Sequence, residues 1–532
     1  MTTSLSQKLT PLTPIIREIC EISGIAGLSY GVILKGDTHF DNFGYRDIEN
    51  KLPPDENTIY HIASLTKAFT AAAVGFLVDE GKLEWETPLR TIMPELAMRD
   101  PEVTNNLAML DVLSHRTGLE QDFDTWMQGD NHLLFGKDQT INVINHLHQI
   151  KPFRSEFQYN NWPFCLAGEI IEKVTGKSYG TVLEDKIFKP LGMDRSSINA
   201  NYSSDSNYAK AYMPLDDRTS VQIPRPEIRD GTLMASAGGV RSCTRDLLKW
   251  AEEHLAAIKA KQGPLNLDNE KLSKLKELDT ILRKHTPMAS SGPQEKSYGL
   301  GWALTTLPNS LGDIGYNKIF VQDMPTVGND SNSRSIIYHQ GSMPGFTSAI
   351  FLIPDLEAAI VVLANSLGLT DVPDWVGQLL VNTISDTTQP NDYIDLAKRG
   401  SEAHIKLYPK IAKELADNRI KGTQPKPLGT YPGDYYNDAK TLLIQVSISE
   451  KGGLQWSFQG LESETYALDH YHNDVFTWHV TRDEDARRGR FTFVGAEYRQ
   501  IKFTVKESGD IDGFIWAHNF EPPADVFKKI LS

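Results

Sequence analysis

The spacing of hydrophobic and polar positions changes along this chain, and each change predicts a different kind of element. Residues 25–50 carry two short apolar runs around a Lys-Gly-Asp turn, which predicts a pair of strands. Residues 64–78 are apolar on every side and predict a helix buried all round, with Gly81 as its stop signal. The pattern is then mostly helical to about residue 260, and four strand-like runs follow between 297 and 366.

Strands at the start, helices in the middle and strands at the end predict one α+β unit whose first strands pair with its last. Residues 391–424 are polar and helix-forming and end in a Pro/Gly-rich junction. Beyond them, short aromatic and β-branched runs predict an antiparallel barrel of about eight strands. The predicted domains are therefore residues 1–390 and 425–532, joined by a helical linker, 391–424.

Composition and charge narrow the class of protein. The 532 residues are 40% apolar and 23% charged, as expected for a globular protein with a sizeable core. The net charge of −15 argues against nucleic acid as the main partner, because phosphate binding needs clustered cations. The same charge is typical of a cytosolic protein kept in solution by self-repulsion.

The cysteines and the N-terminal residues predict the compartment. Cys20, Cys165 and Cys243 lie far apart and are odd in number, so they form neither a disulfide framework nor a zinc pattern. The first ten residues lack the apolar core of a signal peptide. The longest mostly apolar stretch, 68–78, falls well short of the roughly 20 residues that span a bilayer. We expect a cytoplasmic protein with no membrane partner.

Ser64 and Lys67 begin the apolar helix and are the first candidates for chemistry. Residues three apart share a helix face, so the lysine lies beside the serine in otherwise apolar surroundings. Burial lowers the pKa of a lysine, and a neutral amine can take the proton of a nucleophilic serine. Ser273 and Lys276 repeat the spacing in a charge-rich stretch, where we expect only solvated helix surface.

Two further pairs follow along the chain. Tyr159 and Asn161 form a Tyr-x-Asn pair just before a predicted helix, and His339 and Gly341 end a predicted strand. Each pair is weak evidence alone, since Tyr-x-Asn recurs twice in the barrel region and a single histidine is more often structural. In the order Ser-x-x-Lys, Tyr-x-Asn and His-x-Gly, the three together indicate one active site.

With these motifs, the chain resembles the serine β-lactamase and penicillin-binding-protein superfamily, which carries the Ser-x-x-Lys signature. The branch that it resembles contains class C β-lactamase-related esterases, D-aminopeptidases and acyltransferases. The phrases "LSHRTGL", "YGLGW" and "FLIPDLEAAIVVLAN" support the resemblance over roughly residues 10–385. It implies an antiparallel sheet flanked by helices with an all-helical subdomain, and residues 425–532 resemble the lipocalin-like barrel often appended in this family.

The resemblance implies a role for each motif residue. Ser64 is the acylated nucleophile and Lys67 its base. Tyr159 shuttles the proton, which requires a pKa below the ordinary value, with the Lys67 cation as the expected cause. Asn161 hydrogen-bonds Lys67 and the substrate. No cofactor and no metal are implied.

The strand motif carries the oxyanion hole and a departure from the family. The resemblance implies that the backbone N–H groups of Ser64 and Ser342 bind the developing oxyanion, while Gly341 leaves the strand open to substrate. True β-lactamases have Lys-Thr-Gly or Lys-Ser-Gly there, but this chain has His339, which is mostly neutral at pH 7. We therefore expect no dedicated antibiotic hydrolysis, and we expect His339 to donate a hydrogen bond to Tyr159 or to the substrate.

Aromatic residues near the motifs are candidates for an apolar acyl pocket. Residues 120–135 and 303–335 fall where the family places walls around the nucleophile. The candidate substrate-binding aromatics are Phe123, Trp126, Trp162 and Phe346.

Several functions remain open at this point. A small-molecule acyl substrate suits an ester or amide hydrolase, an acyltransferase or cyclase that uses the same acyl-enzyme, or a non-catalytic scaffold on this fold. The Gly-x-Ser-x-Gly elbow of α/β-hydrolases is absent. His146 and His148 lie two apart without an accompanying metal motif, so we interpret them as surface histidines. The barrel either covers the catalytic unit, narrows the cleft or forms the interface of a homo-oligomer.

Overall fold

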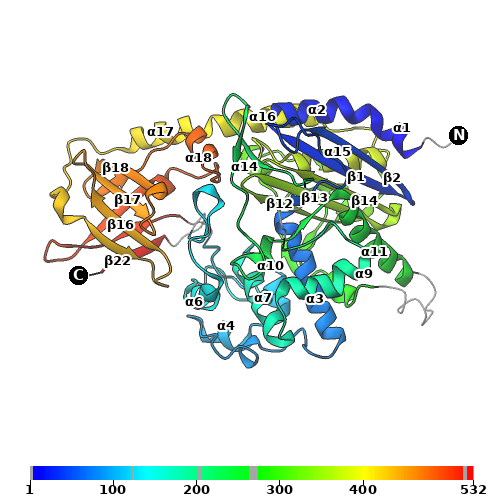
Figure 1. Ribbon diagram of the computed structural model, residues 1–532, viewed down its shortest axis with the longest axis horizontal. Coiled ribbons are helices and arrows are strands. Elements are labelled where there is room, and N and C mark those ends of the chain that lie inside the picture. The colour runs from blue at the N-terminus through cyan, green and yellow to red at the C-terminus, as the bar shows by residue number, and fades with distance from the viewer. Residues whose placement is uncertain are drawn as a thin grey trace.

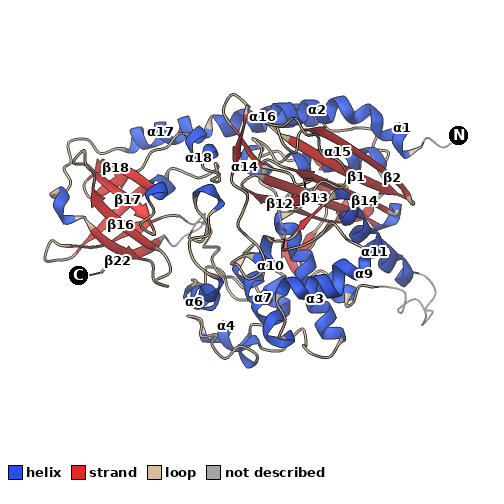
Figure 2. Cartoon of the chain, in the orientation of Figure 1, coloured by secondary structure: helices blue, strands red, loops and turns tan. Residues whose placement is uncertain are grey.

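The computed structural model describes residues 4–122, 125–199, 206–262, 274–290, 292–518 and 524–530. An eight-stranded sheet forms the centre of the first part of the chain (Figures 1 and 2). Its strands are antiparallel to their neighbours. In spatial order they are β2 (Asp37–Gly44), β1 (Gly27–Leu34), β14 (Ala358–Ala364), β13 (Phe346–Ile353), β12 (Arg334–Met343), β9 (Ala303–Leu307), β8 (Lys296–Tyr298) and β7 (Thr286–Met288).

The first strands pair with the last, as the order of elements predicts. Leu28 of β1 lies opposite Ala364 of β14, and Gly27 lies opposite Gly44 of β2. Lys35 and Gly36, with φ of 53° and 87°, make the tight turn between β1 and β2. Positive φ at both positions suits the right-handed twist of a hairpin.

Each face of the sheet packs on its own hydrophobic core. Ile350 and Leu352 of β13 belong to one core, while Phe351 and Ile353 belong to the other, as the period of two along a strand requires. Helices α2 (Thr13–Ile22), α15 (Val372–Ile384) and α16 (Tyr393–Ile405) cover one face. The opposite face carries α3 (Thr66–Asp79), α7 (Trp162–Thr175), α10 (Ala235–Gly238) and α11 (Thr244–Gln262).

Shorter helices complete the helical region on the α3 side of the sheet (Figure 1). They are α4 (Pro101–Asn106), α5 (Met109–Leu113), α6 (Thr140–His146), α8 (Tyr179–Leu183) and α9 (Lys189–Leu191). Helix α3 itself is buried from Thr66 to Leu77, which confirms the prediction of a helix surrounded by protein. Gly81 follows it with φ of 67°.

The C-terminal part is a closed antiparallel barrel, as its aromatic and β-branched pattern predicts. Its strands are β15 (Gly433–Tyr436), β16 (Leu443–Ile448), β17 (Leu454–Phe458), β18 (Thr465–His472), β19 (Val475–Thr477), β20 (Gln500–Val505), β21 (Ile511–Trp516) and β22 (Asp525–Lys529). Trp456, Trp478 and Trp516 fill its centre. Helices α16 and α17 (Leu407–Asn418) connect the barrel to the sheet (Figure 1), while the domain limits at 390 and 424 stay predictions.

The segment between β19 and β20, residues 478–499, leaves the barrel and returns toward the sheet; we refer to it as the β19–β20 connection. It contains α18 (Arg482–Arg487). His404 of α16 makes a 2.8 Å hydrogen bond to the Thr492 hydroxyl within it. Arg490 in the middle of the connection pairs with Glu464, and Arg499 at its end pairs with Asp485 of α18, so one buried ion pair ties the connection to the residues before β18 and the other lies within it.

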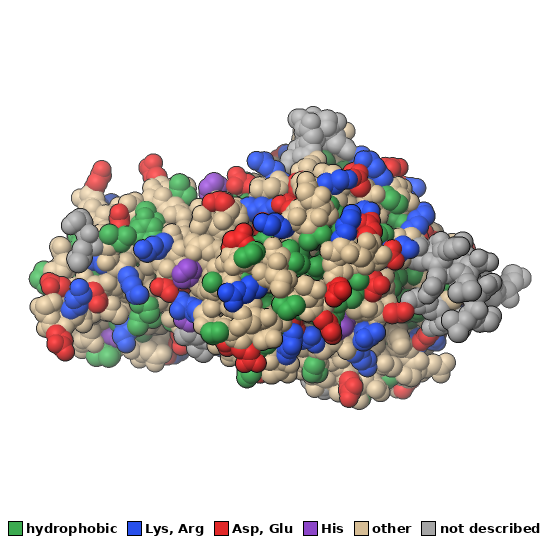
Figure 3. Space-filling view, turned by 90° about the horizontal axis from the view of Figure 1, so that it is seen from below, with side chains coloured by type: hydrophobic (Ala, Val, Ile, Leu, Met, Phe, Trp, Pro, Cys, Tyr) green, Lys and Arg blue, Asp and Glu red, His purple; other side chains and the backbone are tan. Residues whose placement is uncertain are grey.

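The surface carries charges of both signs. In the face shown in Figure 3, Lys and Arg side chains are interspersed with Asp and Glu side chains. Within the described ranges, no helix is both long enough and apolar enough to cross a bilayer.

Candidate active site

Ser64 lies in a short 3₁₀ turn, η2 (Ala63–Leu65), that leads directly into α3. Ala63 has a φ of 46°, a conformation that non-glycine residues adopt at a cost and that often accompanies functional sites. Ser64 is half-buried at the edge of a cavity, and Lys67, one turn along, is fully buried. The helix thus presents the hydroxyl to the cavity and holds the amine behind it.

The Lys67 amine has three neutral partners. Its Nζ donates to Asn161 Oδ1 at 2.7 Å and to the Ala237 carbonyl at 3.0 Å, and it lies 3.1 Å from Ser64 Oγ. A neutral amine has two N–H groups and one lone pair. The two acceptors take the two N–H groups, which leaves the lone pair for the proton of Ser64.

Burial lowers the pKa of Lys67 from its ordinary value of 10.5 to about 7. Removing a cation from water is costly, and none of the three hydrogen-bond partners is a carboxylate that would offset that cost. The neutral form of Lys67 is therefore accessible near pH 7.

Tyr159 lies on the other side of the serine and donates from its hydroxyl to Ser64 Oγ at 2.7 Å. Burial raises its pKa above the ordinary value of 10, opposed by the Ser64 hydrogen bond. The expectation of a lowered pKa is thus corrected, because burial is the dominant cause and outweighs the Ser64 hydrogen bond. Tyr159 holds its proton and is placed to give it away.

Asn161 is brought to Lys67 by helix α7, which begins at the next residue, Trp162. The Ala237 carbonyl comes from α10, which packs closely on α7. A Cβ added to Gly168 would lie 2.3 Å from the Ser236 hydroxyl, and that hydroxyl donates to the Phe164 carbonyl at 2.8 Å. This close approach fixes both acceptors of Lys67 in one place.

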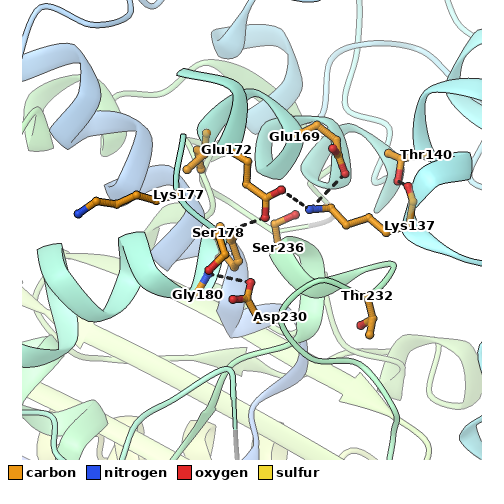
Figure 4. A network of polar contacts seen from close by, with 12 residues as sticks. Lys137, Thr140, Glu169, Glu172, Lys177, Ser178, Gly180, Asp230, Thr232 and Ser236 are labelled. Carbon is orange, nitrogen blue, oxygen red and sulfur yellow. Dashed lines mark hydrogen bonds and ion pairs between the residues drawn. The ribbon is translucent and has the colours of Figure 1, made fainter. Parts of the chain in front are cut away.

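A polar network around α7 and α10 supports this arrangement (Figure 4). Glu172 of α7 accepts from Lys137 Nζ at 2.5 Å and from the Tyr179 backbone N–H at 2.9 Å. Asp230 accepts from the Gly180 backbone N–H at 2.9 Å. The network ties α7, α8 and the segment before α10 together.

His339 is fully buried, and its side-chain hydrogen-bond partner is Tyr298 instead of Tyr159, one of the two expected partners. Its Nε2 lies 2.8 Å from the Tyr298 hydroxyl and its Nδ1 lies 2.5 Å from the Gln340 carbonyl, whereas the Tyr159 and His339 ring centroids are 6.4 Å apart. Burial lowers the pKa of His339 to about 3, so the ring is neutral. Tyr298, which sequence reasoning missed, is therefore the residue that orients His339.

Strand β12 passes directly beside Ser64. A Cβ added to Gly341 would lie 2.9 Å from the Ser64 backbone nitrogen and 2.7 Å from the Ile62 carbonyl, so only glycine fits. Ser342 lines the cavity next to Ser64. The two residues proposed to form an oxyanion hole thus lie at the same edge of the cavity.

The cavity in front of Ser64 has a volume of about 210 Å³ and is mostly apolar. Of the four candidate aromatics, Trp126 lines it, whereas Trp162 and Phe346 are fully buried outside the lining. Phe123 lies outside the described residues. Trp162 and Phe346 are core residues because they face the packed interior of α7 and β13.

Both predicted wall segments contribute to the lining, with Met127 from 120–135 and Ile314, Tyr316 and Ile319 from 303–335. Sequence reasoning missed the other large apolar lining residues, which are Ile228, Met234, Met343, Phe491 and Phe493. Phe491 and Phe493 belong to the β19–β20 connection, and Phe493 stacks on Tyr316 with ring centroids 5.6 Å apart. The two groups of His, Asp and Glu side chains that could hold a metal ion lie outside this cavity.

Comparison with protein families agrees with this geometry. A family described as Beta-lactamase matches residues 12–382, and a domain of unknown function, DUF3471, matches residues 418–528. An unguisins hydrolase from Aspergillus campestris is 27% identical over 442 residues, covering 80% of this chain and 75% of the relative. A beta-lactamase from Escherichia coli is 25% identical over 364 residues, covering 66% of this chain and 86% of the relative.

Solved structures share the fold. An octameric penicillin-binding protein homologue from Pyrococcus abyssi superimposes with a TM-score of 0.56 at 20% identity, covering 98% of this chain and 100% of the other. A class C beta-lactamase gives a TM-score of 0.54 at 21% identity, covering 73% and 98%. The first likeness therefore extends over the barrel as well as the sheet.

Proposed function

The chain belongs to the beta-lactamase family, and we propose that it cleaves an ester or amide bond through an acyl-enzyme on Ser64. The observation that carries the proposal is the contact of Ser64 Oγ with Lys67 Nζ at 3.1 Å and Tyr159 OH at 2.7 Å. One neighbour is placed to take the serine proton, and the other to donate a proton.

In the first half-reaction, Ser64 Oγ attacks the substrate carbonyl carbon while its proton moves to the neutral Lys67 amine. The carbonyl electrons move to oxygen, where the N–H groups of Ser64 and Ser342 stabilise the charge; losing one such donor typically costs about 3 kcal/mol. The bond to the leaving group then breaks. Tyr159 protonates the leaving group and regains a proton from the Lys67 ammonium.

In the second half-reaction, water attacks the ester carbon of the acyl-enzyme. One water proton passes to the neutral Lys67 amine, the bond to Ser64 Oγ breaks, and that oxygen takes a proton back from the Lys67 ammonium. The products are a carboxylic acid and the free enzyme. The net reaction consumes one water and needs no redox partner.

The apolar lining favours an acyl group with a hydrophobic side chain. Trp126, Phe491 and Phe493 offer aromatic contact on the walls of the cavity. His339 replaces the lysine of the antibiotic-hydrolysing relatives and is neutral and buried, so it supplies no cation for a β-lactam carboxylate. We therefore propose ester or amide hydrolysis rather than dedicated antibiotic hydrolysis.

An active-site probe tests the proposal directly. We expect a fluorophosphonate or a penicillin to add one covalent label to the full chain, located on Ser64 by peptide mass spectrometry. Ser64→Ala should abolish labelling, and Ser273→Ala, in the second Ser-x-x-Lys pair, should retain it. Labelling that survives Ser64→Ala would refute the proposal, and a failure of every acyl donor to label the chain would favour a scaffold.

A substrate panel separates hydrolysis from acyl transfer. p-Nitrophenyl esters and D-amino-acid amides, assayed with and without alcohol acceptors, should release acid at the same rate in both conditions if water is the acceptor. New ester product would instead identify an acyltransferase. Light scattering on the same samples tests the homo-oligomer, and fractionation of the source cell tests a cytoplasmic location.

A further inference from the structure

A second cavity, of about 330 Å³, lies where the barrel meets the helical region. Among the described residues, it shares no lining side chain with the cavity of Ser64. Its walls come from the loop after Leu119, from the end of α6 and the residues that follow it, and from both ends of the barrel sequence. These segments are far apart along the chain and meet only in the folded protein.

Five side chains in and beside this cavity can ligate a metal ion. Glu120, His148 and Asp525 form one set of three, and Asp122, His518 and Asp525 form another. Within each set, the ligand atoms all lie within 4.8 Å of one another. Asp525 belongs to both sets.

The charges in this cluster are crowded and buried. Glu120 is 3% exposed, Asp122 is 5% exposed and His518 is 2% exposed. Asp525 is less buried, with 18% of its side chain exposed, and its Oδ2 lies 2.7 Å from His518 Nε2. The cluster therefore brings imidazole nitrogen and carboxylate oxygen together at one point.

Two permanent cations near the cluster form ion pairs with a carboxylate outside it. Arg99 and Lys528 line the same cavity, and both pair with Asp438, Lys528 at 3.7 Å. Asp438 is outside both ligand sets. The cavity therefore contains Asp438, which is paired with protein cations, next to the carboxylate–histidine cluster. Asp438 can serve as the control carboxylate in a metal-binding experiment.

We propose that Glu120, Asp122, His148, His518 and Asp525 form a binding site for a divalent transition-metal ion, for which Zn²⁺ is the best-matched probe. Two atoms bound to one Zn²⁺ at about 2.0–2.2 Å are at most about 4.4 Å apart, so ligands within 4.8 Å converge after small side-chain rotations. Imidazole nitrogen together with carboxylate oxygen suits Zn²⁺, whereas Ca²⁺ and Mg²⁺ prefer oxygen ligands alone.

The ion would join the barrel to a wall of the active site. His518 and Asp525 belong to the barrel region, whereas Glu120 and Asp122 flank Gln121, which lines the cavity of Ser64. The Glu120 carbonyl also accepts from Asn160 Nδ2 at 2.6 Å, and Asn160 lies between Tyr159 and Asn161. Metal binding would therefore fix the loop that borders the nucleophile.

The test uses the full chain carrying Ser64→Ala, so that the result is independent of catalysis. After removal of metals with a chelator, calorimetric titration should show Zn²⁺ binding with micromolar or tighter affinity, undisturbed by millimolar Mg²⁺ or Ca²⁺. Zn²⁺ should also raise Tm by several degrees, because only the folded chain assembles the site.

Variants locate the ion. Asp525→Asn removes the shared ligand and should weaken binding on the order of 100-fold or more, as should His148→Ala, whose half-buried position makes misfolding a smaller concern. Asp438→Asn, in the same cavity, should bind Zn²⁺ like the parent. Absence of binding, preference for Ca²⁺, or equal affinity in Asp525→Asn and His148→Ala would each overturn the proposal and leave the cluster as an ion-pair network.

Discussion

The environments of two buried lysines in the first domain differ in one respect that decides their roles. Lys67 is 0% exposed and Lys296 is 2% exposed. Lys296 donates to Asp313 Oδ2 and to the Ser310 hydroxyl, both at 2.8 Å, whereas the hydrogen-bond partners of Lys67 are neutral. Burial alone does not make a lysine a base. Burial beside neutral acceptors does, because nothing then stabilises the charged form.

The largest effect is expected from removing the Lys67 amine, which has hydrogen-bond partners but no carboxylate partner. Lys67→Met keeps the side-chain length but removes the group that takes the Ser64 proton. We expect kcat/KM for ester hydrolysis to fall about 10³-fold, within the usual range for a lost general base. Lys296→Met, assayed in parallel, should keep kcat/KM within about threefold, since its effect falls on the fold. Equal activity losses in the two variants would contradict the comparison.

The second expected effect is a pH dependence set by Lys67. Acylation needs the neutral amine, and the pKa of Lys67 is about 7. Below pH 7 the neutral fraction falls tenfold per pH unit, so kcat/KM should fall with unit slope and reach a plateau above pH 7. Burial lowers the pKa of His339 to about 3 and that of His115 well below its ordinary value, so neither histidine accounts for an inflection near 7. A flat profile between pH 5 and 8 would remove Lys67 from the base role.

The third prediction concerns the free energy of unfolding, to which we expect Lys296 to contribute more than Lys67. Lys296→Met leaves the Asp313 carboxylate, which is 20% exposed, without its cation. We expect the free energy of unfolding to fall by about 3 kcal/mol, the lower end for a broken buried pair. Lys67→Met should lower the free energy of unfolding by less, because it removes an amine that is costly to bury.

Urea unfolding of the two single variants measures this difference. The double variant Lys296→Met/Asp313→Asn removes both charges and should recover part of the loss. A larger loss in Lys67→Met than in Lys296→Met would show that the Lys67 contacts stabilise the fold more than they serve chemistry.

The smallest effect is expected at Tyr298, the hydrogen-bond partner of His339. Tyr298→Phe removes the hydroxyl that orients His339 through a 2.8 Å hydrogen bond. Loss of about 1 kcal/mol corresponds to about a fivefold lower kcat. KM and the inflection near pH 7 should stay unchanged, which separates positioning from binding. If Tyr298→Phe and His339→Ala both left turnover untouched, His339 would have no part in catalysis.

The contrast between the lysines also shows what the sequence could and could not reveal. The apolar run after Ser64 predicted that Lys67 is buried, and three motifs predicted the approach of Tyr159 and Asn161. The Ala237 carbonyl and the Tyr298–His339 pair gave no signal, because a backbone acceptor 170 residues away depends on helix packing and not on residue type. The pairing of the first strands with the last could be predicted from the hydrophobic pattern, since the sequences of β1 and β14 both form apolar, strand-like runs.

Other residues escaped prediction because tertiary structure assembles them. Trp162 and Phe346 have the same residue types as true pocket residues, and only their placement in α7 and β13 identifies them as core. His148 had no metal-binding spacing in the sequence, since the side chains around it come from the loop at Glu120 and the end of the barrel. The reversed pKa shift of Tyr159 followed from the depth of its burial.

The β19–β20 connection has a practical consequence for anyone who shortens or recombines this gene. Phe491 and Phe493 come from the last tenth of the chain yet form part of the wall of the cavity that Ser64 borders. Truncation at residue 390 would keep every motif residue but remove Phe491 and Phe493. The cavity at Ser64 would then be more open, and its substrate selectivity would change. Exchange of C-terminal halves between relatives would transplant part of the specificity while leaving the catalytic machinery untouched.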